Sequence, residues 1–318
     1  MVSTIYAFSL KMTGASFGSS SSSLRWRVPP SQGGICLIDF LAHQLPHLSR
    51  KQIKRTLDRG GCLVNGQLVW MASWCLHPSD SISWHANSSA SPPPSLEAIY
   101  EDEAFCLLHK GASIVSDLKT LSVLLNRPAA SLWLVHRLDK GTSGLLLLAK
   151  SEAACQALEA QFRQRTVEKE YLAIVEQPPR GTAGAIELPL YRLPQAAAAK
   201  GVSMAIASAS HQGDKLEAFT QWHCLKRRGP FGLLLCRPRT GRTHQIRLHL
   251  ASMGSPVVGD RQYGSRSAEG MEASRHYLHS WKITFSHPTT GERLSFRANP
   301  SSDFEAMAAR LGVDLLEP

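Results

Sequence analysis

The stretch from His136 to Lys150 constrains the fold most, because a short polar turn runs directly into an apolar run. The apolar run, Leu145 to Ala149, is bounded by polar residues and glycine, and a run this short fits a β-strand buried on both faces better than a helix. The preceding turn carries His136, Arg137 and Asp139. A carboxylate at the mouth of a buried strand has a rigid base, so Asp139 is a candidate acid, base or nucleophile. The simpler alternative is an aspartate that only stabilises the turn.

Length and charge limit the classes of protein that this chain can belong to. Its 318 residues, 43% of them hydrophobic, allow two domains with a sizeable core. The longest apolar runs fall far short of the roughly 20 residues that a membrane helix needs, so we expect no membrane partner. A formal charge of +10 favours a polyanionic partner such as a nucleic acid. The seven cysteines are scattered without a Cys-x-x-Cys pair, which predicts reduced thiols and a cytoplasmic location.

The N-terminal segment has an unusual composition. It contains a serine run, and the first acidic residue of the chain is Asp39. No charged n-region followed by a long apolar core is visible, so the segment does not look like a secretory signal. We expect residues 1–33 to form a disordered tail. An organellar transit peptide is the alternative, and it would change the expected location.

Residues 34–86 predict a small folded unit with a basic face. The spacing of apolar residues indicates a helix over 35–45, and Ser49 with Gln52 forms a capping box that starts a second helix. Asn65-Gly66 is a preferred pair for a two-residue hairpin turn, and a further strand is expected at 81–84. A solvated surface is the alternative to RNA binding for the basic residues of the second helix. These residues are Arg50, Lys51, Lys54, Arg55 and Arg59.

Over residues 34–86 the pattern resembles the alpha-L RNA-binding module found in a small-subunit ribosomal protein and in several RNA-modifying enzymes. The Leu48-Ser-Arg-Lys-Gln-Ile53 and Val64-Asn-Gly66 elements carry this resemblance. It implies that the basic helix contacts the RNA backbone. Residues 87–95, rich in proline and serine, then indicate a semi-rigid linker, and residues 96–318 form a second domain.

In the second domain, predicted strands and helices interleave without a regular β-α alternation. This favours an α+β fold with a mixed, largely antiparallel sheet. Strands are expected at 99–100, 105–109, 145–149, 170–175, 218–222 and 231–236, and helices at 121–125, after Ser151 and at 243–253.

Several kinds of chemistry are disfavoured by spacing. His244 and His249 are five residues apart, about 140° around a helix at roughly 100° per residue, so they do not share a face as a zinc-binding pair does. The acidic turn at 101–103 fits a solvated turn better than a metal site. Motifs for acyl transfer, NTP binding and dinucleotide binding are absent from the sequence. What remains is Asp139 in an arginine-rich setting, which includes Arg137, Arg239, Arg242 and Arg247.

Three motifs, in order, closely resemble those of the RluA-type pseudouridine synthases from about residue 98 onward. One departure is Leu108-His-Lys-Gly111, where members of that family usually read Lys-Pro-x-Gly. The matching motifs are His136-Arg-Leu-Asp-Lys-Gly-Thr-Ser-Gly144, Lys169-Glu-Tyr-Leu-Ala173, and Arg239-Thr-Gly-Arg-Thr-His-Gln-Ile-Arg-Leu-His249 with Gly259-Asp-x-x-Tyr-Gly264.

This resemblance implies an RNA pseudouridine synthase that needs no cofactor and no metal. Asp139 would be the catalytic carboxylate, either as a nucleophile or as a base on the sugar, and Arg247 its bidentate ionic partner. Tyr171 would stack on the target base and assist proton transfer. Arg137 is a candidate for filling the space left by a flipped uridine, or for a phosphate contact or surface ion pair. The further expected RNA contacts are His136, Arg242 and His244.

We expect ribosomal RNA as the partner, with transfer RNA as the alternative, and a monomeric enzyme. The rival hypothesis is a catalytically silent RNA-binding or ribosome-assembly factor with the same fold. Retention of Asp139, Tyr171 and Arg247 argues against it, because a silent protein has no need of all three residues.

Overall fold

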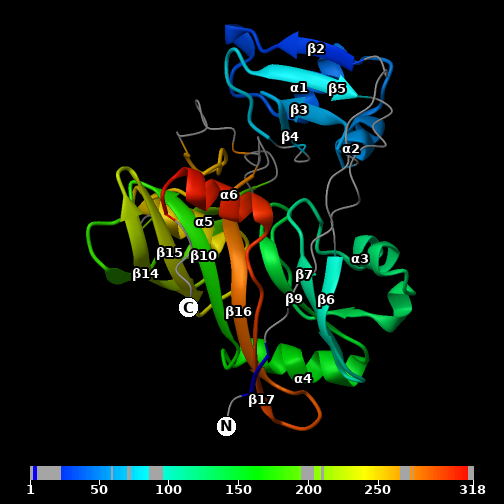
Figure 1. Ribbon diagram of the computed structural model, residues 1–318, viewed down its shortest axis with the longest axis vertical. Coiled ribbons are helices and arrows are strands. Elements are labelled where there is room, and N and C mark those ends of the chain that lie inside the picture. The colour runs from blue at the N-terminus through cyan, green and yellow to red at the C-terminus, as the bar shows by residue number, and fades with distance from the viewer. Residues whose placement is uncertain are drawn as a thin grey trace.

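The computed structural model describes residues 3–5, 23–58, 60–69, 72, 74–85, 96–194, 204–208, 211–265, 273 and 275–313. A small N-terminal sheet with two helices lies above a large sheet that carries the other helices (Figure 1). Each part has a hydrophobic core of its own. Among the described residues, no helix has the length and apolar character needed to cross a membrane.

The N-terminal unit, defined here as residues 23–85, forms a four-stranded sheet in the order β2-β5-β3-β4. Ser49 and Gln52 exchange the hydrogen bonds of the predicted capping box, at 2.8 and 3.3 Å. Asn65 and Gly66 have φ values of 52° and 80° in the predicted two-residue turn. The elements are β2 (Ser23–Arg27), η1 (Pro30–Gln32), α1 (Leu37–Gln44), α2 (Arg50–Asp58), β3 (Cys62–Val64), β4 (Gln67–Leu68) and β5 (Ser81–His85).

The expected disorder over residues 1–33 is wrong for part of that segment. β2 pairs with β5, and Trp26 packs edge-on against Phe40 with ring centroids 6.5 Å apart, so burial of an aromatic ring orders this strand. β1 (Ser3–Ile5) pairs in parallel with a C-terminal strand, β17. Residues 6–22, the predicted linker at 87–95 and Arg59 lie outside the described residues.

The second part is built on a mixed, mostly antiparallel sheet, which confirms the predicted α+β class. Its main path runs β11-β14-β15-β10-β16-β9-β7-β6, and β16 and β9 form the parallel pair at its centre. The strands are β6 (Leu96–Glu101), β7 (Phe105–Lys110), β8 (Trp133–Leu134), β9 (Ser143–Ala149), β10 (Glu168–Glu176), β11 (Ala183–Glu187), β12 (Leu190–Arg192), β13 (Met204–Ile206), β14 (Phe219–Arg228), β15 (Phe231–Pro238), β16 (Leu278–Ser286) and β17 (Arg293–Arg297). The helices are α3 (Leu118–Leu125), η2 (Ala129–Ser131), α4 (Glu152–Arg163), α5 (Gln245–Ser252) and α6 (Ser302–Arg310).

β9 is buried on both faces, as its apolar run predicted. Leu145 and Leu147 pack into the cluster that includes α4, whereas Leu146 and Leu148 pack into the cluster that includes α3 and α5. This division follows from the two-residue period of a strand. Gly144 has a φ of 107°, and a Cβ atom there would overlap the backbone of β16, so a glycine is required where β9 begins. The result is a fixed base for the loop before β9.

Candidate active site

Asp139 lies in the loop between β8 and β9, called the Asp139 loop below, and hydrogen bonds to the backbone hold this loop in place. Segments far apart in the sequence make these bonds, so the position of the Asp139 backbone depends on the tertiary fold. The bonds are Ser116 Oγ to Leu138 O at 3.0 Å, Ser113 N to Lys140 O at 2.8 Å and Arg275 Nη1 to Gly141 O at 3.1 Å.

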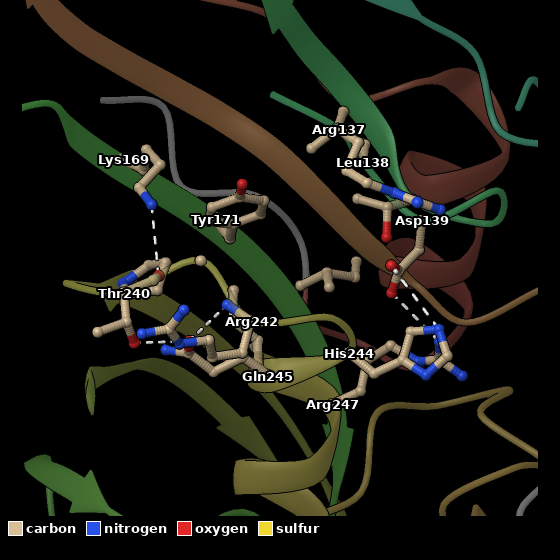
Figure 2. Close-up of a pocket in the computed structure, with 15 residues that line it drawn as sticks. Arg137, Leu138, Asp139, Lys169, Tyr171, Thr240, Arg242, His244, Gln245 and Arg247 are labelled. Atoms are coloured by element: carbon tan, nitrogen blue, oxygen red, sulfur yellow. Dashed lines mark hydrogen bonds and ion pairs between the residues drawn. The ribbon is translucent and has the colours of Figure 1, made fainter. Parts of the chain in front are cut away.

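Tyr171 reaches the same site from β10. It pairs with Ser280 of β16, and Ser280 pairs with Gly144 of β9, so Tyr171 lies level with the Asp139 loop across three adjacent strands. Burial raises the pKa of Tyr171 to about 12, although a hydrogen bond with Ser280 acts in the opposite direction. The side chain is therefore a neutral phenol near pH 7. Figure 2 shows its ring between Lys169 and Asp139.

Arg247, on α5, connects two carboxylates. Its Nε and Nη2 donate to both oxygens of Asp260, at 2.7 and 2.8 Å, and Nη2 also donates to Gln262 Oε1 at 2.6 Å. A single bond of 3.2 Å joins Nη1 to Asp139 Oδ2. The expectation that Arg247 is bidentate with Asp139 is therefore wrong, because the bidentate pair is made by Nε and Nη2 with Asp260 and only Nη1 reaches Asp139. Asp260 orients Arg247, and Arg247 presents its remaining donor to Asp139.

Arg247 stays protonated although its side chain is buried. Burial by itself would lower its pKa, but Asp260 and then Asp139 outweigh that effect and hold the pKa above its usual range. His244 Nε2 lies 3.8 Å from Asp139 Oδ1, and its other ring nitrogen lies 2.7 Å from the Tyr263 hydroxyl. Burial lowers the pKa of His244 while Asp139 acts the other way. Arg247 thus places a buried positive charge beside Asp139.

These side chains surround a cavity of about 80 Å³. Arg137 and Arg242 are exposed at its edge, as expected of RNA contacts. Lys169 lines it as well, with its pKa lowered by burial to about 8 and its Nζ 3.4 Å from Thr240 O. The sequence suggested Lys169 only as a cation near the end of the helix after Ser151, but it lies in β10, where its position two residues before Tyr171 places both on one face of the strand.

His136 has a different position from the one expected. It does not line the cavity. Its Nε2 accepts a hydrogen bond from Leu147 N at 3.0 Å, and its ring stacks on Phe162 with centroids 5.1 Å apart. Burial, with a smaller effect of Lys169, lowers its pKa to about 3, so the ring is neutral. These contacts show that His136 supports β9, and an RNA contact by His136 stays a prediction.

The predicted RNA-binding helix is α2, and its charged residues are exposed. Lys54 pairs with Asp58 at 2.8 Å, and Arg50 pairs with Asp39. Lys51 and Arg55 have exposed side chains on the same helix. RNA contact by these residues stays a prediction.

Comparison with known proteins decides the family. Residues 105–252 match the family model described as RNA pseudouridylate synthase. A Chloroflexus aurantiacus protein named as an uncharacterized RNA pseudouridine synthase is 32% identical over 307 residues, which cover 89% of this chain and 92% of that protein. The chain belongs to the RNA pseudouridine synthase family. The RluA-type assignment made from the motifs is confirmed, and the enzyme is an isomerase that acts on uridine in RNA.

Other RNA pseudouridine synthases extend this likeness. The Vibrio cholerae ribosomal large subunit pseudouridine synthase C is 30% identical over 302 residues, covering 86% of this chain and 92% of that protein. Among solved structures, human RNA pseudouridylate synthase domain containing 1 superposes with a TM-score of 0.58 and 27% identity, covering 69% of this chain and 89% of that one. The likeness includes the cavity around Asp139, because the matched residues 105–252 contain Asp139, Tyr171 and Arg247.

Proposed function

We propose that Asp139 is the catalytic carboxylate of this pseudouridine synthase. One observation carries the proposal: among the described residues that line the cavity, Asp139 is the sole carboxylate, and it is 19% exposed beside a buried guanidinium. In the reaction, the bond from C1′ of the ribose to N1 of uracil breaks and a bond from C1′ to C5 forms. The proton on C5 is lost and N1 gains one, so atoms and charge balance without a redox step.

Arg247 keeps the carboxylate in its reactive form. Attack on carbon and abstraction of a sugar proton both require an ionised Asp139, and an adjacent positive charge favours that form. Because Asp260 fixes the orientation of Arg247, the charge is already in place before the substrate arrives. Such preorganisation is a large source of rate enhancement in a site that excludes water.

Tyr171 and Arg137 act on the displaced base. The target uridine must leave the helical stack at a cost of a few kcal/mol, which stacking on an aromatic ring offsets in part. Tyr171 offers that ring on the cavity wall, and its neutral phenol can donate a hydrogen bond. Arg137 is exposed at the edge, where it can occupy the space that the uridine vacates.

Ribosomal RNA is the proposed substrate class. Proteins similar to this chain carry the names ribosomal large subunit pseudouridine synthase C and D. The formal charge of +10 and the exposed basic residues of α2 fit a large structured RNA. Transfer RNA is the alternative substrate.

Tritium release tests both parts of the proposal. RNA transcribed with uridine labelled at C5 loses tritium when C5 bonds to the ribose. We expect release from ribosomal RNA transcripts above that from transfer RNA transcripts, and none with the Asp139→Asn variant. Binding without release from either RNA would overturn the assignment and favour a silent RNA-binding factor. Release from transfer RNA alone would refute the substrate class.

A further inference from the structure

The N-terminal unit is fixed to the catalytic part through Arg261. This side chain is only 5% exposed, and its guanidinium lies 4.1 Å from the ring centroid of Trp74. Its Nη1 donates to Cys75 O at 3.1 Å and to Asp80 Oδ2 at 3.2 Å. A side chain buried in this way has no surface to offer RNA, so its role lies in the contact between the two parts.

Asp80, the acceptor for Arg261, is itself a central residue of the N-terminal unit. It accepts hydrogen bonds from Asn65 Nδ2 and from His77 N, both at 2.8 Å. Asn65 belongs to the hairpin turn, so Arg261 is attached to the backbone framework of the unit. This attachment is stiffer than one made to a mobile surface side chain.

A second contact joins the unit to the Asp139 loop. Lys140 Nζ lies 2.6 Å from Asp58 Oδ1, at the end of α2. Lys140 directly follows Asp139, and Arg261 directly follows Asp260. Both anchors of the N-terminal unit are therefore the chain neighbours of the two carboxylates that share Arg247.

The residues on either side of Arg261 strengthen this connection. Asp260 and Gln262 both accept hydrogen bonds from Arg247, while Arg261 between them contacts the N-terminal unit. Trp74 also lines, together with Arg247, Asp260 and Gln262, a cavity of about 10 Å³. That volume is at the lower limit for one water molecule, and the side chains of Arg247 and Asp260 are only 4% and 1% exposed, so Trp74 packs where little room for water remains behind this pair.

From this arrangement we propose that the N-terminal unit positions the catalytic carboxylate, in addition to any contact with RNA. Arg261 is a positioning residue: it ties the segment that orients Arg247 to Trp74 and Asp80. The inference rests on the proposed roles of Asp139 and Arg247. An ion pair acts most strongly when water is excluded and its geometry is fixed, so release of this contact weakens catalysis after RNA has bound.

Single-turnover kinetics with the full-length protein test the inference. We expect Arg261→Met and Trp74→Leu each to lower the rate at saturating RNA by about tenfold or more, with a smaller change in Kd. The double variant should be no slower than the slower single variant, because both changes remove one contact. Arg261→Lys, which keeps the charge, should recover part of the rate. Arg163→Met is the matched control, since this exposed residue is on α4, far from the N-terminal unit (Figure 1).

Two results would overturn the positioning role of Arg261. A wild-type rate at saturating RNA with a raised Kd would overturn the inference, because the contact would then serve RNA binding alone. Multiplicative effects in the double variant would also overturn it. Thermal unfolding of every variant verifies folding, and if Arg261→Met does not fold, Trp74→Leu and Arg261→Lys give the same rate comparison. If Asp139→Asn is inactive while the contact variants react normally, the inference fails and the proposed function stands.

Discussion

Replacing Arg247 with alanine should destabilise the protein through Asp260 more than through Asp139. The side chain of Asp260 is 1% exposed and loses two hydrogen bonds, whereas that of Asp139 is 19% exposed, loses one, and can take up water in exchange. Breaking a buried pair by removing one partner costs about 3–5 kcal/mol. We assign most of that cost to the orphaned Asp260 carboxylate. At about 2–4 °C per kcal/mol, Tm should fall by roughly 10 °C.

Differential scanning calorimetry measures this change, and Arg242→Ala is its control. Arg242 is an exposed arginine at the edge of the same cavity, and its side chain donates to Glu217 O at 3.1 Å. Its loss should alter the free energy of unfolding by about 0.5 kcal/mol or less. Asp260→Asn should resemble Arg247→Ala in stability, and Asp139→Asn should not. An Arg247→Ala protein with the Tm of the wild type would refute the assignment of Arg247–Asp260 as a buried structural pair.

Three further predictions follow from the structure. Burial lowers the pKa of Lys110 from 10.5 to about 7, so between these pH values the unfolded protein binds more protons than the folded protein. The free energy of unfolding, measured relative to that of Lys110→Met, should therefore rise by about 1 kcal/mol per pH unit from pH 7 to 10. A difference that does not change with pH would contradict this. Tyr171→Phe keeps the ring, so RNA affinity should persist while single-turnover isomerisation slows; an unchanged rate would exclude a role for the hydroxyl. RNA affinity should fall steeply as salt concentration rises, and the double variant Lys51→Gln/Arg55→Gln should reduce the slope of log affinity against log salt concentration by about two. An unchanged slope would exclude these residues as phosphate contacts.

Local features of the fold were predictable from the sequence because they depend on neighbours in the chain. The capping box at Ser49, the Asn65-Gly66 turn and the buried strand after Gly144 were all predicted correctly. Ser151 also caps α4 as expected, accepting a hydrogen bond from Ala154 N at 3.2 Å. The order of strands, with β16 between β9 and β10, was not accessible, because pairing between distant segments leaves little trace in local patterns.

The candidate site was predictable where a motif carried it and not where burial decided the role. Asp139, Tyr171 and Arg247 meet around one cavity, as the resemblance implied. His136 belongs to the same motif, yet its ring accepts a hydrogen bond from Leu147 N and stacks on Phe162, contacts that no local pattern indicates. Asp260 was not predicted to pair with Arg247, because that pairing depends on how the loop after α5 folds back.

The contact between the two parts was also beyond sequence reasoning. The sequence predicted that only a linker connects the N-terminal unit to the catalytic part, whereas Arg261 and Lys140 also join the two parts. Nothing in the sequence pairs Trp74 with Arg261, which are 187 positions apart in the chain. Such contacts depend on the packing of two preformed surfaces.

The most direct test of the central claim is the rate of pseudouridine formation by Asp139→Asn under single-turnover conditions, with saturating RNA and a verified fold. The substitution preserves size, and Arg247 keeps its pair with Asp260, so the Tm and RNA affinity should stay close to those of the wild type. The account predicts no detectable pseudouridine. Formation at the wild-type rate would contradict the assignment of Asp139 as the catalytic carboxylate.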